Sequence, residues 1–266
     1  MATRLRVGAV TYLNTKPLVY RLEQFAPYVE LSFDLPSRLA DHLAAGQLDV
    51  ALIPSIEFFH NSTYKIISDA CIACHGPVLS VKLFCRVPVP QIRTLALDEG
   101  SRTSAALSRL LLKERFGLEP RLKSLRVDQP FSDDVSADAV LIIGDRAIHS
   151  PAASFAEVWD LGDQWCRWAG LPFVFAMWVA HSGVNAAELA PALAEARDCG
   201  VANLQRIAEK EAAPLGLTAP QCVAYLRDHL HFYLGSRERE GLQLFYSKAS
   251  AMGLVPQNSQ FTSAVA

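Results

Sequence analysis

The first third of the chain alternates short apolar runs with segments of helical spacing. Apolar runs rich in β-branched residues at 5–10, 29–35 and 50–54 predict three strands. The segments between them, 15–25 and 36–49, carry apolar residues at helical spacing. This order of strands and helices predicts a parallel sheet with helices on its faces.

The middle of the chain has a second unit of the same kind. Strand-like residues 80–86 run into Val-Pro-Val-Pro at 87–90, which we interpret as a hinge into a second lobe. Beyond it, 94–98 and 138–145 have the pattern of strands, and 105–117 that of a helix ended by glycine.

The last part of the pattern leads back to the first unit. Residues 171–180 form a long apolar strand, and 185–252 are helical in pattern. We therefore predict an α/β fold of two lobes with a central cleft and two crossover strands. We expect lobe 1 to contain residues 1–88 and 177–266, and lobe 2 residues 89–176. A ligand in such a fold lies between the lobes, at the carboxyl ends of strands.

Composition excludes several classes of protein. The chain has 266 residues, 51% hydrophobic and 20% charged, with a formal net charge of -2. This balance is typical of a soluble enzyme or binding protein, and it lacks the basic excess of a nucleic-acid binder. The longest apolar runs fall short of the ~20 residues of a membrane helix. No apolar signal segment precedes the first strand, so we expect a cytoplasmic protein with reduced cysteines.

Cysteine and histidine spacing gives little sign of metal or haem. Cys71, Cys74 and His75 match the C-x-x-C-H pattern of haem attachment, but that chemistry requires export. We interpret the two cysteines as small buried residues near a strand, with a redox-sensitive thiol pair as the alternative. His229 and His231 are two apart and would point to different sides of a helix. We therefore expect no metal site.

Polar turns follow two strands of the first lobe. Tyr12, Asn14 and Lys16 come after the first strand, and Ser55 after the third. Asn14 and Ser55 are candidates for ligand contacts, and helix capping is the alternative for both. Lys16 would lie against the positive end of a helix dipole, which costs roughly 0.3–1 kcal/mol unless an anion is near. It either meets such an anion or turns out to water.

The second lobe and the hinge add hydroxyl groups and free backbone N–H groups. Ser80 lies close to the predicted hinge, and Thr103 and Ser104 begin a helix after a glycine-containing loop. A helix N-terminus of this kind suits a carboxylate or phosphate, although one hydroxyl must serve as the cap. Gly144 and Asp145 end the central strand, and Asp145 is either a ligand contact or a cap. The set favours a small anion and lacks an obvious acid–base pair.

Six segments resemble, in this order, the chorismate dehydratases of the futalosine route to menaquinone, whose fold resembles type II periplasmic binding proteins. They are "TYLNTKPL", "GQLDVALIPSIEFF", "CIACHGPVLSVKLF", "IIGDRA", "GLPFVFAMW" and "FYLGSREREGLQLFY". The likeness covers residues 6–253. "YLNTKP" with "GPVLSVKLF" and "GLPFVFAMW" is specific, whereas "GQLDVALI" occurs in many solute-binding proteins.

The resemblance implies that chorismate loses water to give 3-[(1-carboxyvinyl)oxy]benzoate, without a cofactor. In this interpretation Asn14 polarises the reacting centre and Ser80 lies beside it. The two substrate carboxylates would bind at the helix start 103–104 and near Lys16 and Ser55. Because the inferred cleft is short of titratable groups, we expect the enolpyruvyl carboxylate of the substrate to be the base.

Two other functions fit the same pattern. One is a non-catalytic binding protein for a small anionic solute. The other is the related enzyme 1,4-dihydroxy-6-naphthoate synthase, which shares the fold. A plain α/β domain with capped helices explains each polar turn singly but not their convergence. As partners we expect a small dicarboxylate, no nucleic acid and no membrane, in a monomer or weak homodimer.

Overall fold

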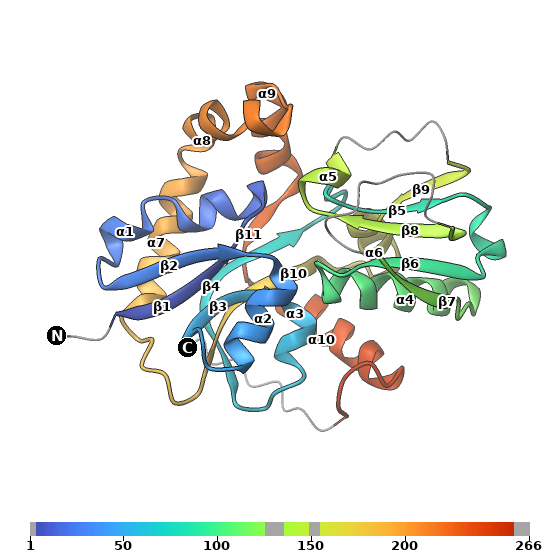
Figure 1. Cartoon of the computed structure of the whole chain (residues 1–266), viewed down its shortest axis with the longest axis horizontal. Coiled ribbons are helices and arrows are strands. Elements are labelled where there is room, and N and C mark those ends of the chain that lie inside the picture. The colour runs from blue at the N-terminus through green and yellow to red at the C-terminus, as the bar shows by residue number, and fades with distance from the viewer. Residues whose placement is uncertain (1–3, 126–135, 149–154, 258–266) are drawn as a thin grey trace.

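The computed structural model describes residues 4–125, 136–148 and 155–257, and these form two β-sheets, each flanked by helices (Figure 1). One sheet lies on each side of the view in Figure 1, and the chain passes between them twice. The predicted two-lobed α/β fold is confirmed.

The first sheet has six strands in the order β11-β4-β10-β3-β1-β2. They are β1 (Leu5–Val10), β2 (Val29–Asp34), β3 (Val50–Pro54), β4 (Tyr64–Cys74), β10 (Phe173–His181) and β11 (His231–Tyr233). β1 pairs in parallel with β2 and β3, as the first third of the sequence predicted. β10 runs antiparallel to β3 and β4. Every residue of β3 is buried, which accounts for its unbroken apolar run.

Short helices connect these strands. They are η1 (Leu13–Val19), α1 (Leu22–Phe25), α2 (Pro36–Ala44) and α3 (Ser55–Phe58). The single helix expected at 15–25 is two elements, the 3₁₀ helix η1 and α1. They are separated because Arg21 takes a left-handed conformation, with φ of 56°.

The second sheet has five strands in the order β7-β6-β8-β5-β9. They are β5 (Val81–Cys85), β6 (Thr94–Asp98), β7 (Arg121–Leu125), β8 (Ala139–Ile143) and β9 (Glu157–Asp160). Its helical segments are η2 (Val89–Gln91), α4 (Arg102–Phe116), α5 (Asp145–Ile148) and α6 (Leu161–Ala169). β6 is parallel to β7 and β8, and β5 is antiparallel to β8 and β9.

Both crossings come earlier in the chain than the boundaries predicted at 88/89 and 176/177. β5, which was assigned to lobe 1, pairs in the second sheet, so the chain first crosses at residues 75–80. Pro88 and Pro90 therefore lie inside the second lobe, at η2. The return crossing falls at 170–172, because the whole of β10 pairs in the first sheet.

The C-terminal part is helical and packs on the first lobe and the crossings. Its elements are α7 (Leu189–Val201), α8 (Leu204–Glu211), η4 (Ala213–Leu215), α9 (Ala219–Ala224), the π-helix η5 (Tyr225–His229) and α10 (Ser236–Ala251). Trp165 of α6, Phe173 of β10 and Phe245 of α10 stack edge to face, with ring centres 5.0–6.0 Å apart. This aromatic cluster fixes the second crossing against α10. Within the described ranges, no helix has the length and apolar character needed to cross a membrane.

Candidate active site

A narrow cavity lies between the lobes, and five of the nine candidate residues line it. They are Tyr12, Asn14, Ser80, Ser104 and Gly144. About 460 Å³ of the cavity is free of protein atoms, but the centre of a water-sized sphere can move through only about 40 Å³. Phe175 and other apolar side chains form the rest of the wall. Among the described lining residues, none is Asp, Glu, His, Lys or Arg.

Tyr12 reaches from the first lobe onto the glycines of the second. A Cβ atom at Gly144 would lie 2.7 Å from the Tyr12 ring, and one at Gly100 would lie 3.4 Å from its hydroxyl. Gly144 also has φ of +72°, so both the turn and the close approach require glycine there. The Tyr12 hydroxyl is buried and has no hydrogen-bond partner within the described ranges. Burial, and next the charge of Asp98, raise its pKa, so the phenol keeps its proton.

Asp145 joins the lobes beside this contact. Its two carboxylate oxygens accept the backbone N–H of Leu13 at 3.2 and 3.3 Å. The carboxylate therefore faces the start of η1 and holds the Tyr12–Asn14 turn against the second lobe.

Ser55 and Thr103 form a second contact between the lobes. Ser55 Oγ donates to the carbonyl of Val174 at 2.8 Å and lies 3.4 Å from Thr103 Oγ1. Thr103 Oγ1 accepts the backbone N–H of Ile56 at 3.2 Å. Both side chains are fully buried, and neither is among the described residues that line the cavity. They connect α3 to α4.

The N-terminus of α4 faces the cavity. The expected cap at Thr103 or Ser104 was wrong, because Ser101 is the cap. Its Oγ accepts the backbone N–H of Ser104 at 3.3 Å and lies 3.0 Å from Ser104 Oγ. Ser101 and Ser104 both line the cavity. The other N–H groups of the first turn have no intrahelical acceptor, so this end of the helix is suited to an anion.

A strained turn positions Ser80. Leu79 has φ of 58°, and the N–H of Ser80 donates to the carbonyl of Val78 at 2.7 Å. Asp160 holds this turn, because its carboxylate accepts the N–H groups of Val78 and Leu79 at 2.9 and 2.7 Å. Burial raises the pKa of Asp160, and the three backbone N–H groups it accepts, with Asp163 as the third, act in the opposite direction. Asp160 was not among the residues predicted from the sequence.

Tyr225 lies beside Asn14 and Ser80 but is not among the described residues that line the cavity. Burial has the largest effect on the Tyr225 phenol and raises its pKa. The side chains of Ser80 and Asn14 act in the opposite direction but are outweighed. The oxygen makes no well-aligned hydrogen bond within the described ranges. Tyr225 starts the π-helix η5, a rare element that is frequent at functional sites. Tyr225 was not predicted from the sequence either. A π-helix has no local sequence pattern, and Ser80 is 145 positions away from Tyr225.

Lys16 does not line the cavity among the described residues. Its Nζ lies 3.2 Å from the carboxylate of Glu211 and 5.6 Å from the centre of the Phe33 ring. The positive charge of Lys16, which we expected near a substrate carboxylate, is therefore paired with Glu211 within the protein.

A wider and more open hollow adjoins the cavity and shares Ser101 with it. It has about 1060 Å³ of room for a water-sized sphere, and its wall carries both basic and acidic side chains: Arg38, Arg102, Lys123, Asp98 and Glu99.

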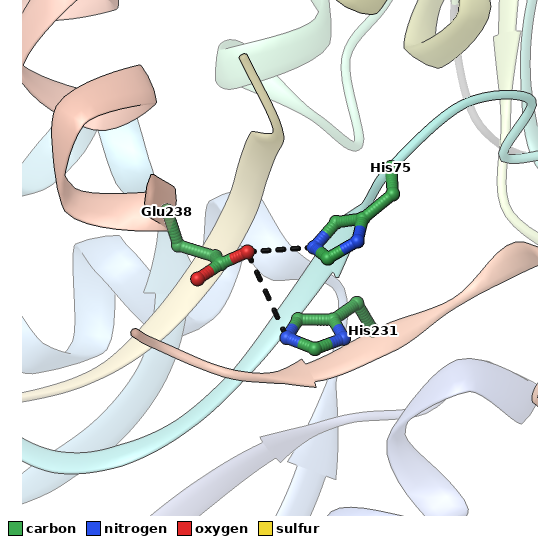
Figure 2. Close-up of side chains that lie close together, drawn as sticks. All are labelled: His75, His231 and Glu238. Atoms are coloured by element: carbon green, nitrogen blue, oxygen red, sulfur yellow. Dashed lines mark hydrogen bonds and ion pairs between the residues drawn. The ribbon is translucent and has the colours of Figure 1, made fainter. Parts of the chain in front are cut away.

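Cys71 and Cys74 lie on β4 and are fully buried. Burial raises the pKa of Cys71, and a hydrogen bond with Cys166 followed by burial raises that of Cys74. At the crossing just after Cys74, His75 meets His231 and Glu238 outside the cavity (Figure 2). This cluster has the residue types of a metal site and was also missed, because His75 is more than 150 positions away from His231 and Glu238.

The chain belongs to a family described as "Menaquinone biosynthesis", whose sequence profile it matches over residues 5–251. It is 33% identical to a chorismate dehydratase of Thermus thermophilus over 268 residues, which cover 93% of this chain and 95% of that one. It is 29% identical to a chorismate dehydratase of Campylobacter jejuni over 175 residues, 64% of each chain.

Solved structures with the same fold share little sequence with the chain. Protein AF1704 of Archaeoglobus fulgidus superimposes with a TM-score of 0.75 at 15% identity, covering 96% of this chain and 99% of that one. The periplasmic aliphatic sulphonate binding protein SsuA of Escherichia coli gives 0.65 at 16% identity, covering 97% and 90%. The periplasmic-binding-protein-like fold that the sequence analysis expected is thereby confirmed.

Proposed function

We propose that this protein is a chorismate dehydratase, which removes water from chorismate to give 3-[(1-carboxyvinyl)oxy]benzoate. The observation that carries the proposal is the convergence of Tyr12, Asn14, Ser80 and the α4 N-terminus on one cavity. The chorismate dehydratase of Thermus thermophilus matches this chain over nearly its whole length.

The cavity supplies groups that suit a dicarboxylate. One substrate carboxylate binds at the first turn of α4, where Ser104 adds a hydroxyl to the free N–H groups. The second lies on the side of Tyr12, whose protonated phenol is an available donor. Because the cavity is narrow, the lobes separate to admit the substrate and close over it. Asp145 and the Ser55–Thr103 pair are the contacts that re-form on closure.

The chemistry needs little from the protein beyond placement and polar stabilisation. The proton on C3 passes to the enolpyruvyl carboxylate of the substrate, and its electron pair forms the last ring double bond as the C4–O bond breaks. That proton then leaves with the departing oxygen as water. The absence of a carboxylate or imidazole among the described lining residues supports a substrate-borne base.

Three side chains stabilise the departing oxygen. Asn14 and Ser80 offer hydrogen bonds at the reacting centre, and Tyr225 behind them offers a phenol that stays protonated. In a closed site, hydrogen-bond donors that are in place before the charge develops stabilise that charge far more than water would. Lys16 acts at a distance, since its pairing with Glu211 anchors η1 to α8.

Incubating the protein with chorismate, without additions, tests the proposal. We expect a product lighter by one water, with the ultraviolet absorption of a substituted benzoate. If chorismate binds but is recovered unchanged, the result would favour the alternative of a solute-binding protein. SsuA, which has the same fold, is a protein of that kind. Turnover of cyclic dehypoxanthine futalosine instead would identify a 1,4-dihydroxy-6-naphthoate synthase.

Location and assembly are part of the same proposal. We propose a cytoplasmic monomer or weak homodimer. All six cysteines are free thiols, as a reducing compartment would keep them.

A further inference from the structure

We propose that His75, His231 and Glu238 bind one divalent transition-metal ion, with Zn²⁺ as the reference ion, at the first crossing between the lobes. Figure 2 shows the two imidazole rings and the carboxylate pointing toward one another from three separate elements. His75 follows β4, His231 lies on β11, and Glu238 lies in the first turn of α10.

The distances suit a single ion. Glu238 Oε1 lies 2.6 Å from His75 Nε2 and 3.7 Å from His231 Nε2, and all three ligand atoms fall within 4.8 Å of one another. An ion about 2.0–2.1 Å from each atom of a tetrahedral site requires separations of roughly 3.3 Å. The two distances to the carboxylate bracket that value. His75 is about half exposed, so its ring is free to make the small adjustment.

The donor set also fits. Imidazole nitrogen with one carboxylate oxygen is the ligand set of many three-residue zinc sites, which leave a fourth position for water. Two neutral imidazoles and one carboxylate carry a net negative charge. The neighbouring cation Arg197 is paired with Asp69 and Asp198, so it does not neutralise the cluster.

The carboxylate is held in place before any ion binds. Glu238 is buried, and its other oxygen accepts the backbone N–H of Gly235 at 3.0 Å, which is the N3 half of a capping box at the start of α10. His231 is fixed by strand pairing, opposite Ala73 of β4. Supporting hydrogen bonds of this kind orient metal ligands.

A hydrogen bond between His75 and Glu238 explains less of the arrangement. A neutral His75 can donate its Nε2–H to the Glu238 carboxylate, but this bond does not involve His231, whose Nε2 lies 3.7 Å from the same oxygen and whose ring centre lies 4.1 Å from that of His75.

Binding there would stiffen both crossings. The ion would tie His75, on the first crossing, to α10. In the same helix Gly241 packs so closely on Pro172 of the second crossing that a Cβ atom would lie 2.1 Å from its carbonyl oxygen. The site would therefore limit how far the lobes move apart.

Calorimetric titration of the full chain with Zn²⁺ tests the proposal. We expect one ion per chain and a higher melting temperature with Zn²⁺ present. Glu238→Gln is the sharpest variant, because Gln also completes a capping box and so preserves the helix start. We expect Glu238→Gln and His75→Ala to weaken binding more than tenfold. His60→Ala, which removes an exposed histidine elsewhere on the first lobe, should bind as the wild type does.

Cobalt substitution identifies the ligands. Co²⁺ bound to nitrogen and oxygen in a tetrahedral site absorbs in the visible range and lacks the near-ultraviolet charge-transfer band of a thiolate. No stoichiometric binding by the wild type, equal binding by Glu238→Gln, or a thiolate band would overturn the proposal. None of these measurements uses chorismate, so the proposed activity and the metal site stand or fall separately.

Discussion

The Asp145 carboxylate of the second lobe accepts the backbone N–H of Leu13 of the first lobe, at 3.2 and 3.3 Å to its two oxygens. The residues that precede them, Gly144 and Tyr12, are packed directly on each other. These two adjacent contacts hold the turn that carries Asn14. The turn that carries Asn14 therefore keeps its place through contacts with the second lobe.

Asp145→Asn tests whether this carboxylate only holds the lobes. One acceptor oxygen remains, so we expect kcat/KM to fall by no more than about tenfold, mostly through KM, as for the loss of about one hydrogen bond. The pH profile of kcat should keep its shape. Loss of the limb that reports a base would contradict the substrate-borne base and assign that role to Asp145.

Gly144→Ala tests the Tyr12 contact. The positive φ alone should cost about 1 kcal/mol in the free energy of unfolding. The clash with the Tyr12 ring should in addition displace the Tyr12–Asn14 turn and lower kcat. Gly117→Ala is the matched control, because Gly117 has φ of +66° with open space around it.

Urea unfolding and steady-state kinetics of both glycine variants separate the two effects. Equal losses of stability with full activity in both would show that the Tyr12 contact is not needed for turnover.

Asp160→Asn tests the turn before Ser80. The amide replaces an acceptor by a donor where Val78 and Leu79 direct their N–H groups. We expect a loss of about 1–3 kcal/mol in the free energy of unfolding, although the cost of burying a charge is removed. Activity should fall with it, as Leu79 leaves its left-handed conformation. Denaturant titration with parallel activity assays checks this, and a variant as stable and active as the wild type would contradict it.

Tyr225→Phe removes one hydroxyl and preserves the packing of the ring. If the phenol assists the departing oxygen, kcat should fall about 10²-fold or more, with KM little changed. Tyr233→Phe, which loses a hydroxyl bonded to Asp198 on the surface, should leave kcat unchanged. Equal kinetics for both variants would remove Tyr225 from the mechanism.

The raised pKa of Tyr225 also has a consequence for stability. The native phenol stays protonated at pH values where the unfolded one, near pH 10, ionises. The native state then binds more protons, so the free energy of unfolding should fall as the pH rises above about 10. Chemical denaturation between pH 8 and 11 should show a smaller fall in Tyr225→Phe.

Asn14→Ala should lower kcat by about 10²–10³-fold, the usual loss for one donor at a developing anion, with a much smaller change in KM. Lys16→Met should lower kcat much less, because Lys16 does not line the described cavity and acts only through its pair with Glu211. Initial rates at several chorismate concentrations separate the two parameters. Similar losses in kcat and binding would make Asn14 a positioning residue.

Local chemistry made much of the fold predictable. The all-buried strand β3 has an unbroken apolar run, and α4 ends at Gly117, so both could be found from sequence, although α4 starts at Arg102 and not at 105. Cavity residues such as Asn14 and Ser104 follow strand ends, where ligands gather in α/β folds.

The features that could not be predicted depend on contacts between residues far apart in the sequence. A buried strand such as β5 looks the same in either sheet, so its sequence did not reveal that it pairs with β8 and β9. Asp160 supports Ser80 from 80 positions away, and Glu211 neutralises Lys16 from 195 positions away. Contacts of this kind are created by folding and have no spacing that a sequence pattern can show.

A crystal structure of Asn14→Ala soaked with chorismate tests directly whether chorismate binds in the cavity between the lobes, because the slow variant should retain its substrate. We expect the ring in the cavity against Ser80, with Tyr225 behind Ser80, one carboxylate at the first turn of α4, and the enolpyruvyl carboxylate facing C3. A vacant cavity, or chorismate bound elsewhere on the chain, would contradict it.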